Sequence, residues 1–123
     1  MSSPTHTVLL VEDSPDLGPL LQETLEEWEH RAVLARTAAE AIDLIASEPV
    51  GLILLDHELP DMCAPELLDA LRSKHRTIPP VVLMTARLRP GTEGSWPELV
   101  DVLRKPFDLA DLAAVLQRRL PRR

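Results

Sequence analysis

The chain has 123 residues, of which 45% are hydrophobic and 27% charged, and its net charge is −7 at pH 7. This length suits one domain over residues 1–123 with a buried core, and the acidic balance argues against nonspecific binding to nucleic acid. No apolar stretch approaches the roughly 20 residues of a membrane-spanning helix, and the first residues, MSSPTHT, do not form a signal peptide. The single cysteine suits a reducing compartment. We therefore expect a cytoplasmic domain.

Apolar periodicity and helix-capping residues predict nine regular elements. In chain order they are a strand at 7–11, a helix at 15–29, a strand at 31–35, a helix at 38–48, a strand at 51–56, a helix at 64–73, strands at 81–84 and 99–104, and a helix at 109–116. Strands that alternate with helices favour an α/β fold with a parallel sheet covered on both faces. A fourth helix belongs before the last strand, but residues 87–97 hold two prolines, two glycines and no apolar periodicity. We therefore expect an eroded fourth helix and mostly loop there.

Five polar or charged residues stand at the carboxyl ends of these strands, namely Glu12, Asp13, Asp56, Thr85 and Lys105. Ligands of an open parallel sheet bind at this edge, so we expect the five side chains to lie together. Each residue alone has an ordinary structural role, as a helix cap, a turn former or a surface residue. Their occurrence together, each at the end of a strand, indicates a functional site.

The residue types point to phosphoryl transfer. Three close carboxylates repel one another and need a divalent cation, and hard oxygen ligands with several retained waters favour Mg²⁺. A cation beside a carboxylate suits phosphoryl transfer, in which the protein mainly positions groups and neutralises charge. We interpret Asp56 as the nucleophile that forms an acyl phosphate. Thr85 would hydrogen-bond one phosphoryl oxygen, and Lys105 would pair with another.

The stretches VLLVEDSPD, LILLDHELP, VVLMTA and LRKPF resemble the receiver domain of two-component response regulators, over nearly the whole chain. The resemblance implies a five-stranded (βα)5, flavodoxin-like fold and phosphorylation of Asp56 by a histidine kinase or a histidine phosphotransfer protein. It also implies that Mg²⁺ is bound through Glu12, Asp13, Asp56 and the backbone carbonyl of Glu58, and that the peptide bond before Pro106 is cis. Such a domain is a phosphoacceptor in signalling that promotes only its own phosphorylation and dephosphorylation, and is not otherwise an enzyme.

The chain departs from the family pattern where the phosphorylation signal is usually transmitted. Val102 replaces the aromatic switch residue, so we expect the response to run through residues 87–97 instead. The residues that flank the path of the hydrolytic water in the family correspond here to Glu58 and Arg87, which carry opposite charges. If these side chains meet over Asp56, or if Arg87 turns to the phosphoryl group, we expect them to lengthen the lifetime of the phosphoryl group. The alternative is two solvated side chains that never meet.

Two further side chains have alternative interpretations. His57 follows Asp56 on the same strand and is expected to face the opposite side of the sheet; the alternative is a catalytic role next to the nucleophile. Trp96 either fills the space left by the eroded helix or is exposed as an anchor for a partner.

Because the chain ends after the last helix, we expect a stand-alone receiver that signals through an unidentified protein partner, by docking or phosphorelay, with no role for nucleic acid or membrane. One alternative is a degenerate receiver that binds partners without being phosphorylated. Another is a phosphatase of the haloacid dehalogenase type, which also places a nucleophilic aspartate at a strand end. In that family the nucleophile comes early and the acidic pair late, and the second aspartate would be Glu58 here.

Overall fold

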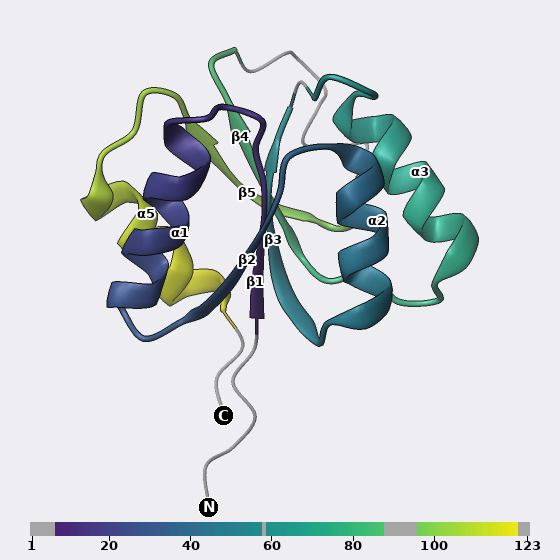
Figure 1. Ribbon diagram of the computed structural model, residues 1–123, viewed down its shortest axis with the longest axis horizontal. Helices are drawn as coiled ribbons and strands as arrows, with labels where there is room; N and C mark the ends of the chain where they lie inside the picture. The colour runs from purple at the N-terminus through teal and green to yellow at the C-terminus, as the bar shows by residue number, and fades with distance from the viewer. Residues whose placement is uncertain (1–6, 58, 88–95, 121–123) are drawn as a thin grey trace, which may run out of the picture.

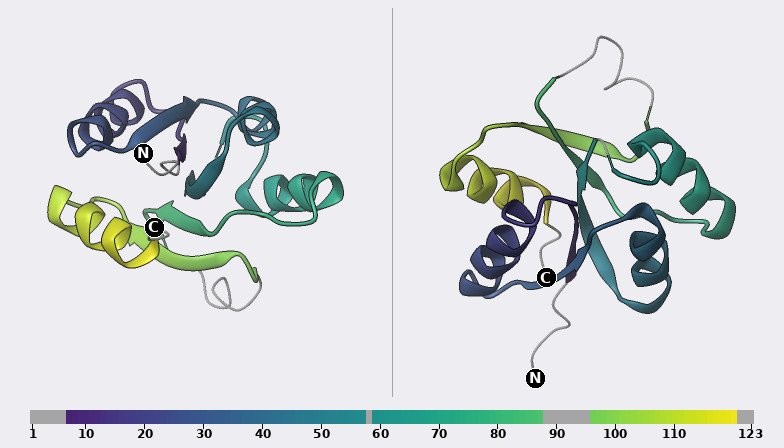
Figure 2. Two further views of the ribbon diagram at one scale, coloured as in Figure 1. Left: turned by 90° about the horizontal axis from the view of Figure 1, so that it is seen from below. Right: turned by 45° about the horizontal axis from the view of Figure 1, so that its top comes forward.

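The chain folds into three layers, with helices on both faces of one parallel sheet (Figure 1). The structure is a computed structural model and describes residues 7–57, 59–87 and 96–120. The strands are β1 Thr7–Val11, β2 Arg31–Ala35, β3 Val50–Asp56, β4 Val81–Thr85 and β5 Leu99–Arg104, in the sheet order β2-β1-β3-β4-β5. The helices are α1 Leu17–Glu27, α2 Ala38–Ser47, α3 Ala64–Lys74 and α5 Leu109–Arg119. Helices α1 and α5 cover one face of the sheet, and α2 and α3 cover the other (Figure 2).

The central strands supply the core on both faces of the sheet. Alternate residues of β1 point to opposite faces, so that Leu9 and Val11 pack with α2 and α3 whereas Val8 and Leu10 pack with α1 and α5. Every residue of β1 and β4 is buried. Burial on two faces explains the unbroken apolar runs of these strands and confirms the predicted parallel α/β sheet. In the described part of the chain, no helix is both long and apolar enough to cross a membrane.

The first helix is shorter at both ends than the sequence predicts. The Ser14 hydroxyl accepts a hydrogen bond from the Leu17 N–H at 3.1 Å, but the regular helix begins only at Leu17. At the other end, Glu29 takes a left-handed conformation with a φ of 68°. The N–H of His30 then bonds back to the Leu25 carbonyl at 2.9 Å. A left-handed residue in this position commonly ends a helix, and glycine is the residue that usually signals it.

Between β4 and β5 the described residues form no helix, in agreement with the predicted erosion of the fourth helix. Trp96 stands just before β5, is only 8% exposed and packs on the α2 and α3 side of the sheet. Its carbonyl accepts the Leu99 N–H at 3.1 Å. The structure therefore supports the interpretation of Trp96 as a core residue, not as an exposed anchor. Most of the predicted loop, residues 88–95, lies outside the described residues.

A bidentate ion pair ties α3 to the segment that leads into β5. Arg72 donates from Nε and Nη2 to the two carboxylate oxygens of Glu98, at 3.0 and 2.6 Å. The hydrogen bonds from Arg72 hold the pKa of Glu98 below its usual value, so the carboxylate stays ionised. Glu98 lies two positions after Trp96, so a buried ring and an ion pair together anchor this segment to the α3 side of the sheet.

Replacing Trp96 by alanine would remove a large buried side chain, and we expect the free energy of unfolding to fall by about 3 kcal/mol. Urea unfolding followed by circular dichroism measures the change. Trp28→Ala is the matched control, because Trp28 is only partly buried and packs on the α1 side of the sheet. A loss for Trp96→Ala no greater than that for Trp28→Ala would contradict the core role of Trp96.

Candidate functional site

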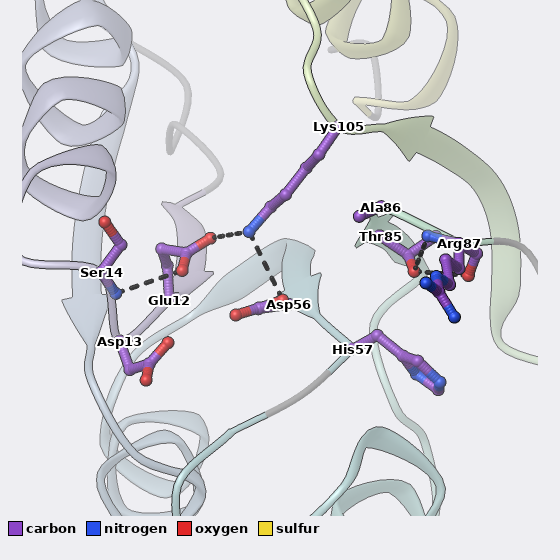
Figure 3. A pocket seen from close by; sticks show the side chains of 9 residues that line it. All are labelled: Glu12, Asp13, Ser14, Asp56, His57, Thr85, Ala86, Arg87 and Lys105. Atoms are coloured by element: carbon purple, nitrogen blue, oxygen red, sulfur yellow. Dashed lines mark hydrogen bonds and ion pairs between the residues drawn. The ribbon is translucent and has the colours of Figure 1, made fainter.

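The structure brings together the five residues that the sequence places at the strand ends. Glu12 and Asp13 directly follow β1, Asp56 ends β3, Thr85 ends β4, and Lys105 directly follows β5. The chain runs from β1 outward to β2 and then returns to β3 on the other side of β1. Ligands of parallel sheets bind at such a reversal of strand order. The five side chains line a pocket of about 550 Å³ (Figure 3), together with Ser14, His57, Ala86 and Arg87.

Three carboxylates lie close together on the β1 and β3 side of the pocket. One oxygen from each of Glu12, Asp13 and Asp56 lies within 4.8 Å of the other two. Glu12 and Asp56 are buried, whereas Asp13 is exposed to solvent. A set of oxygen donors that is open to water on one side fits Mg²⁺, a hard cation that retains several waters. Glu58, whose backbone carbonyl is the fourth predicted ligand, lies outside the described residues.

Glu12 is held in one orientation by hydrogen bonds to both of its carboxylate oxygens. Lys105 Nζ donates to Oε1 at 2.8 Å, and the backbone N–H of Ser14 donates to Oε2 at 3.2 Å. The backbone N–H of Glu12 donates in turn to the carbonyl of Ala35, at the end of β2, at 3.0 Å. The contribution of Ser14 could not be predicted from the sequence, because a backbone N–H donor leaves no mark on residue type.

Lys105 bridges carboxylates that belong to two different strands. Besides Glu12, its Nζ makes an ion pair with Asp56 Oδ1 at 3.5 Å (Figure 3). Burial alone would lower the pKa of Lys105, but the hydrogen bond to Glu12 and the charge of Asp56 outweigh it and raise the pKa. Lys105 therefore remains a cation beside Asp56. Its backbone N–H donates to the Thr85 carbonyl at 2.8 Å, and the peptide bond to Pro106 is cis, as the resemblance to receiver domains implies.

The Thr85 hydroxyl makes local hydrogen bonds within the turn that follows β4. It donates to the Arg87 carbonyl at 2.7 Å and accepts from the Arg87 N–H at 3.1 Å. Hydroxyl side chains commonly stabilise turns in this way. Thr85 thus lies at the predicted place in the pocket wall, with its hydroxyl proton directed to the backbone of its own loop.

Three other residues that the sequence singles out lie to the side of the carboxylate cluster. His57 points away from Asp56 in Figure 3, as expected, and its ring lies 6.2 Å from the Trp96 ring, centroid to centroid. Arg87 is exposed and lies beside Thr85. Val102 is partly buried and packs on the α2 and α3 side of the sheet.

Asp61 caps the start of α2, a role that could not be predicted from the sequence. It lies in the loop between β3 and α3, and its carboxylate accepts hydrogen bonds from the first two N–H groups of α2. The residues that it caps are more than 20 positions earlier in the chain, so no local sequence pattern announces the contact.

A family model for the response regulator receiver domain matches residues 8–117 of the chain. Response regulator protein PilR of Pseudomonas aeruginosa is 35% identical over 106 residues, which are 85% of this chain and 24% of that protein. Transcriptional regulatory protein QseB of Haemophilus influenzae is 33% identical over 118 residues, which are 94% of this chain and 53% of that protein. A probable cyclic di-GMP phosphodiesterase of Vibrio cholerae is 31% identical over 106 residues, which are 84% of this chain and 24% of that protein. The chain thus spans between about a quarter and about half of these relatives.

Solved receiver structures share the fold. Chemotaxis protein CheY4 of Vibrio cholerae has a TM-score of 0.83 at 25% identity, with 95% of this chain and 100% of that chain covered. The receiver domain of a sensor histidine kinase from Pseudomonas aeruginosa, with a magnesium ion coordinated in its active-site cleft, has a TM-score of 0.79 at 26% identity. That comparison covers 94% of this chain and 98% of the other. With a family match over residues 8–117 and the same five-stranded architecture, this chain belongs to the response regulator receiver domain family.

Proposed function

We propose that this receiver domain accepts a phosphoryl group on Asp56 from a histidine kinase or a histidine phosphotransfer protein, with Mg²⁺ as its cofactor. The observation that carries the proposal is the cluster of three carboxylates beside the Lys105 ammonium, at the point where the strand order reverses. The phosphorylated domain then signals by docking to a partner protein or by passing the phosphoryl group on. It promotes its own phosphorylation and dephosphorylation and acts on no separate substrate.

In the transfer, a carboxylate oxygen of Asp56 attacks the phosphorus of a phosphohistidine. The O–P bond forms as the P–N bond breaks, and the imidazole nitrogen keeps the electron pair of the broken bond. Asp56 ends a strand that is buried along almost its whole length, so the nucleophile is mounted on a rigid element. The Lys105 ammonium, next to Asp56, offsets charge on the incoming phosphoryl oxygens. Bound Mg²⁺, held by Glu12, Asp13 and Asp56, would supply further charge neutralisation.

Thr85 offers a route by which phosphorylation affects the rest of the domain. Before its hydroxyl can donate to a phosphoryl oxygen, it must release the Arg87 carbonyl that it now binds. This release frees the backbone that leads into residues 88–95. We infer that the response runs through residues 87–97. Val102 is small and has no hydroxyl, so it is not expected to change between buried and exposed positions when Thr85 moves.

Of the alternatives that the sequence leaves open, one still makes a distinct prediction. A degenerate receiver would bind its partners but take no phosphoryl group, and the labelling experiment below separates the two functions. The phosphatase interpretation loses its basis, because the receiver family model accounts for residues 8–117.

Asp56→Asn is expected to abolish phosphorylation, because an amide cannot form the acyl phosphate. Acetyl phosphate with Mg²⁺ is the phosphoryl donor, and intact-protein mass spectrometry detects the addition of one phosphoryl group. Asp16→Asn is the control, since Asp16 is exposed, lies close to the site in sequence and makes no side-chain capping bond. Labelling of Asp56→Asn at the wild-type level would refute Asp56 as the acceptor, and an unlabelled wild-type protein would favour the degenerate receiver.

Asp13→Asn is expected to weaken Mg²⁺ binding by about tenfold or more, because it removes one of three clustered negative charges. Isothermal titration calorimetry of the unphosphorylated protein measures the dissociation constant. Asp16→Asn again serves as the control, since it makes the same change in net charge outside the cluster. Equal affinities for the two variants would show that Asp13 is not part of the cation site.

Arg87→Ala is expected to shorten the lifetime of the acyl phosphate, because a guanidinium near the phosphoryl oxygens hinders the approach of water in line with the bond. Loss of label after removal of acetyl phosphate gives the dephosphorylation rate. Arg76→Ala is the control, because Arg76 is exposed and lies between α3 and β4, at the opposite edge of the sheet. If Arg87→Ala and Arg76→Ala lose the label equally fast, Arg87 is only a surface charge.

A further inference from the structure

Asp61 joins two segments of the chain that flank the carboxylate cluster. Its Oδ1 accepts the Ala38 N–H at 2.9 Å, and its Oδ2 accepts the Ala39 N–H at 3.0 Å. Ala38 and Ala39 are the first two residues of α2, and Asp61 lies in the loop that leads from β3 to α3. These two bonds therefore hold the loop that follows Asp56 against the start of α2.

The start of α2 has a clear requirement for these acceptors. The first four N–H groups of a helix have no partner within it. The Thr37 side chain accepts the Glu40 N–H at 3.1 Å, and Asp61 accepts the N–H groups of Ala38 and Ala39. The Ala41 N–H makes the first regular helical bond, to the Thr37 carbonyl. The Ala38 N–H is the main reason that the pKa of Asp61 is lowered, so a full negative charge faces the positive end of the helix dipole.

The same end of α2 is also connected to the site from the β1 side. Ala35, the last residue of β2, accepts the Glu12 N–H at 3.0 Å, and α2 begins three positions later. A continuous path thus connects Glu12 to Asp56. It runs through the hydrogen bond from Glu12 to Ala35, along the chain to α2, through the two hydrogen bonds to Asp61, and along the loop to Asp56. Asp61 provides the connection between α2 and the loop.

The other contacts of the loop fix it mainly on the α3 side. The Ala64 N–H donates to the His57 carbonyl at 3.2 Å, and the side chains of Leu59 and Met62 pack against the core between the sheet and helices α2 and α3. These contacts keep the loop folded. The hydrogen bonds of Asp61 to α2 fix where the loop lies relative to the end of β1.

We propose that Asp61 is a positioning residue of the phosphorylation site. By tying the loop to α2, it holds Asp56 at the spacing from Glu12 and Asp13 that a divalent cation and a phosphoryl group require. This inference rests on the proposed function, and Asp61 acts in it only through the backbone. It differs from a simple helix cap, which contributes to the stability of the fold and leaves the affinity of the site unchanged.

The test compares two caps of the same helix. Thr37→Ala removes the other side-chain acceptor from the start of α2 but does not touch the loop after Asp56, so both Thr37→Ala and Asp61→Ala are expected to lower the melting temperature. Only Asp61→Ala is expected to weaken Mg²⁺ binding, by about tenfold. Calorimetric titration is done at a temperature at which both variants are folded. Asp61→Asn keeps one carbonyl acceptor, and its affinity is expected to fall between those of Asp61→Ala and the wild type.

The rate of labelling by acetyl phosphate gives a second comparison, in which Asp61→Ala is expected to be slower than Thr37→Ala. Equal Mg²⁺ affinities and equal labelling rates in the two variants would overturn the inference and leave Asp61 as a cap alone. A wild-type protein that binds Mg²⁺ but takes no phosphoryl group would overturn the proposed function instead. The Mg²⁺ affinities of the two variants would then still decide the role of Asp61.

Discussion

The close approach of three carboxylates at one edge of the sheet is the constraint on which the site depends. Glu12, Asp13 and Asp56 each place an oxygen within 4.8 Å of the other two, and at this distance like charges repel strongly. The strands that carry them are neighbours in the parallel sheet, with Val11 of β1 paired to Leu55 of β3, and this pairing brings the three groups close together. Lys105 offsets part of the charge by bridging Glu12 and Asp56. The remaining negative charge makes the pocket a better site for a divalent cation than for a free anion.

The strands and the main site residues could be predicted because both follow from one property of parallel sheets. Strands buried on two faces appear in sequence as unbroken apolar runs, such as residues 7–11 and 81–85, and all of them end at the same edge. The polar residue directly after each run must then lie at that edge. Residues such as Asp56 and Lys105 could therefore be grouped into one site without knowledge of any contact between them.

Other features could not be predicted, because they depend on backbone conformation or on distant partners. Glu29 ends α1 in a left-handed conformation that glycine would have signalled. The bond from the Thr85 hydroxyl to the Arg87 carbonyl depends on how the turn folds and not on residue type. Asp61 looks like an ordinary turn residue after Pro60, and its partners in α2 come into reach only once the sheet has brought β1 and β3 together.

The bond between Lys105 and Glu12 joins residues that are 93 positions apart, and this separation has a consequence for the folding of the chain. Closing a long loop costs entropy, and contacts of high sequence separation slow folding. During synthesis β1 and β3 emerge before β5, so Glu12 and Asp56 are present for a time without the lysine that bridges them. A nascent chain that stops before β5 carries the repulsion of the carboxylates without its relief. The last strand therefore completes the sheet and also brings Lys105, which directly follows it, to the carboxylates of the pocket.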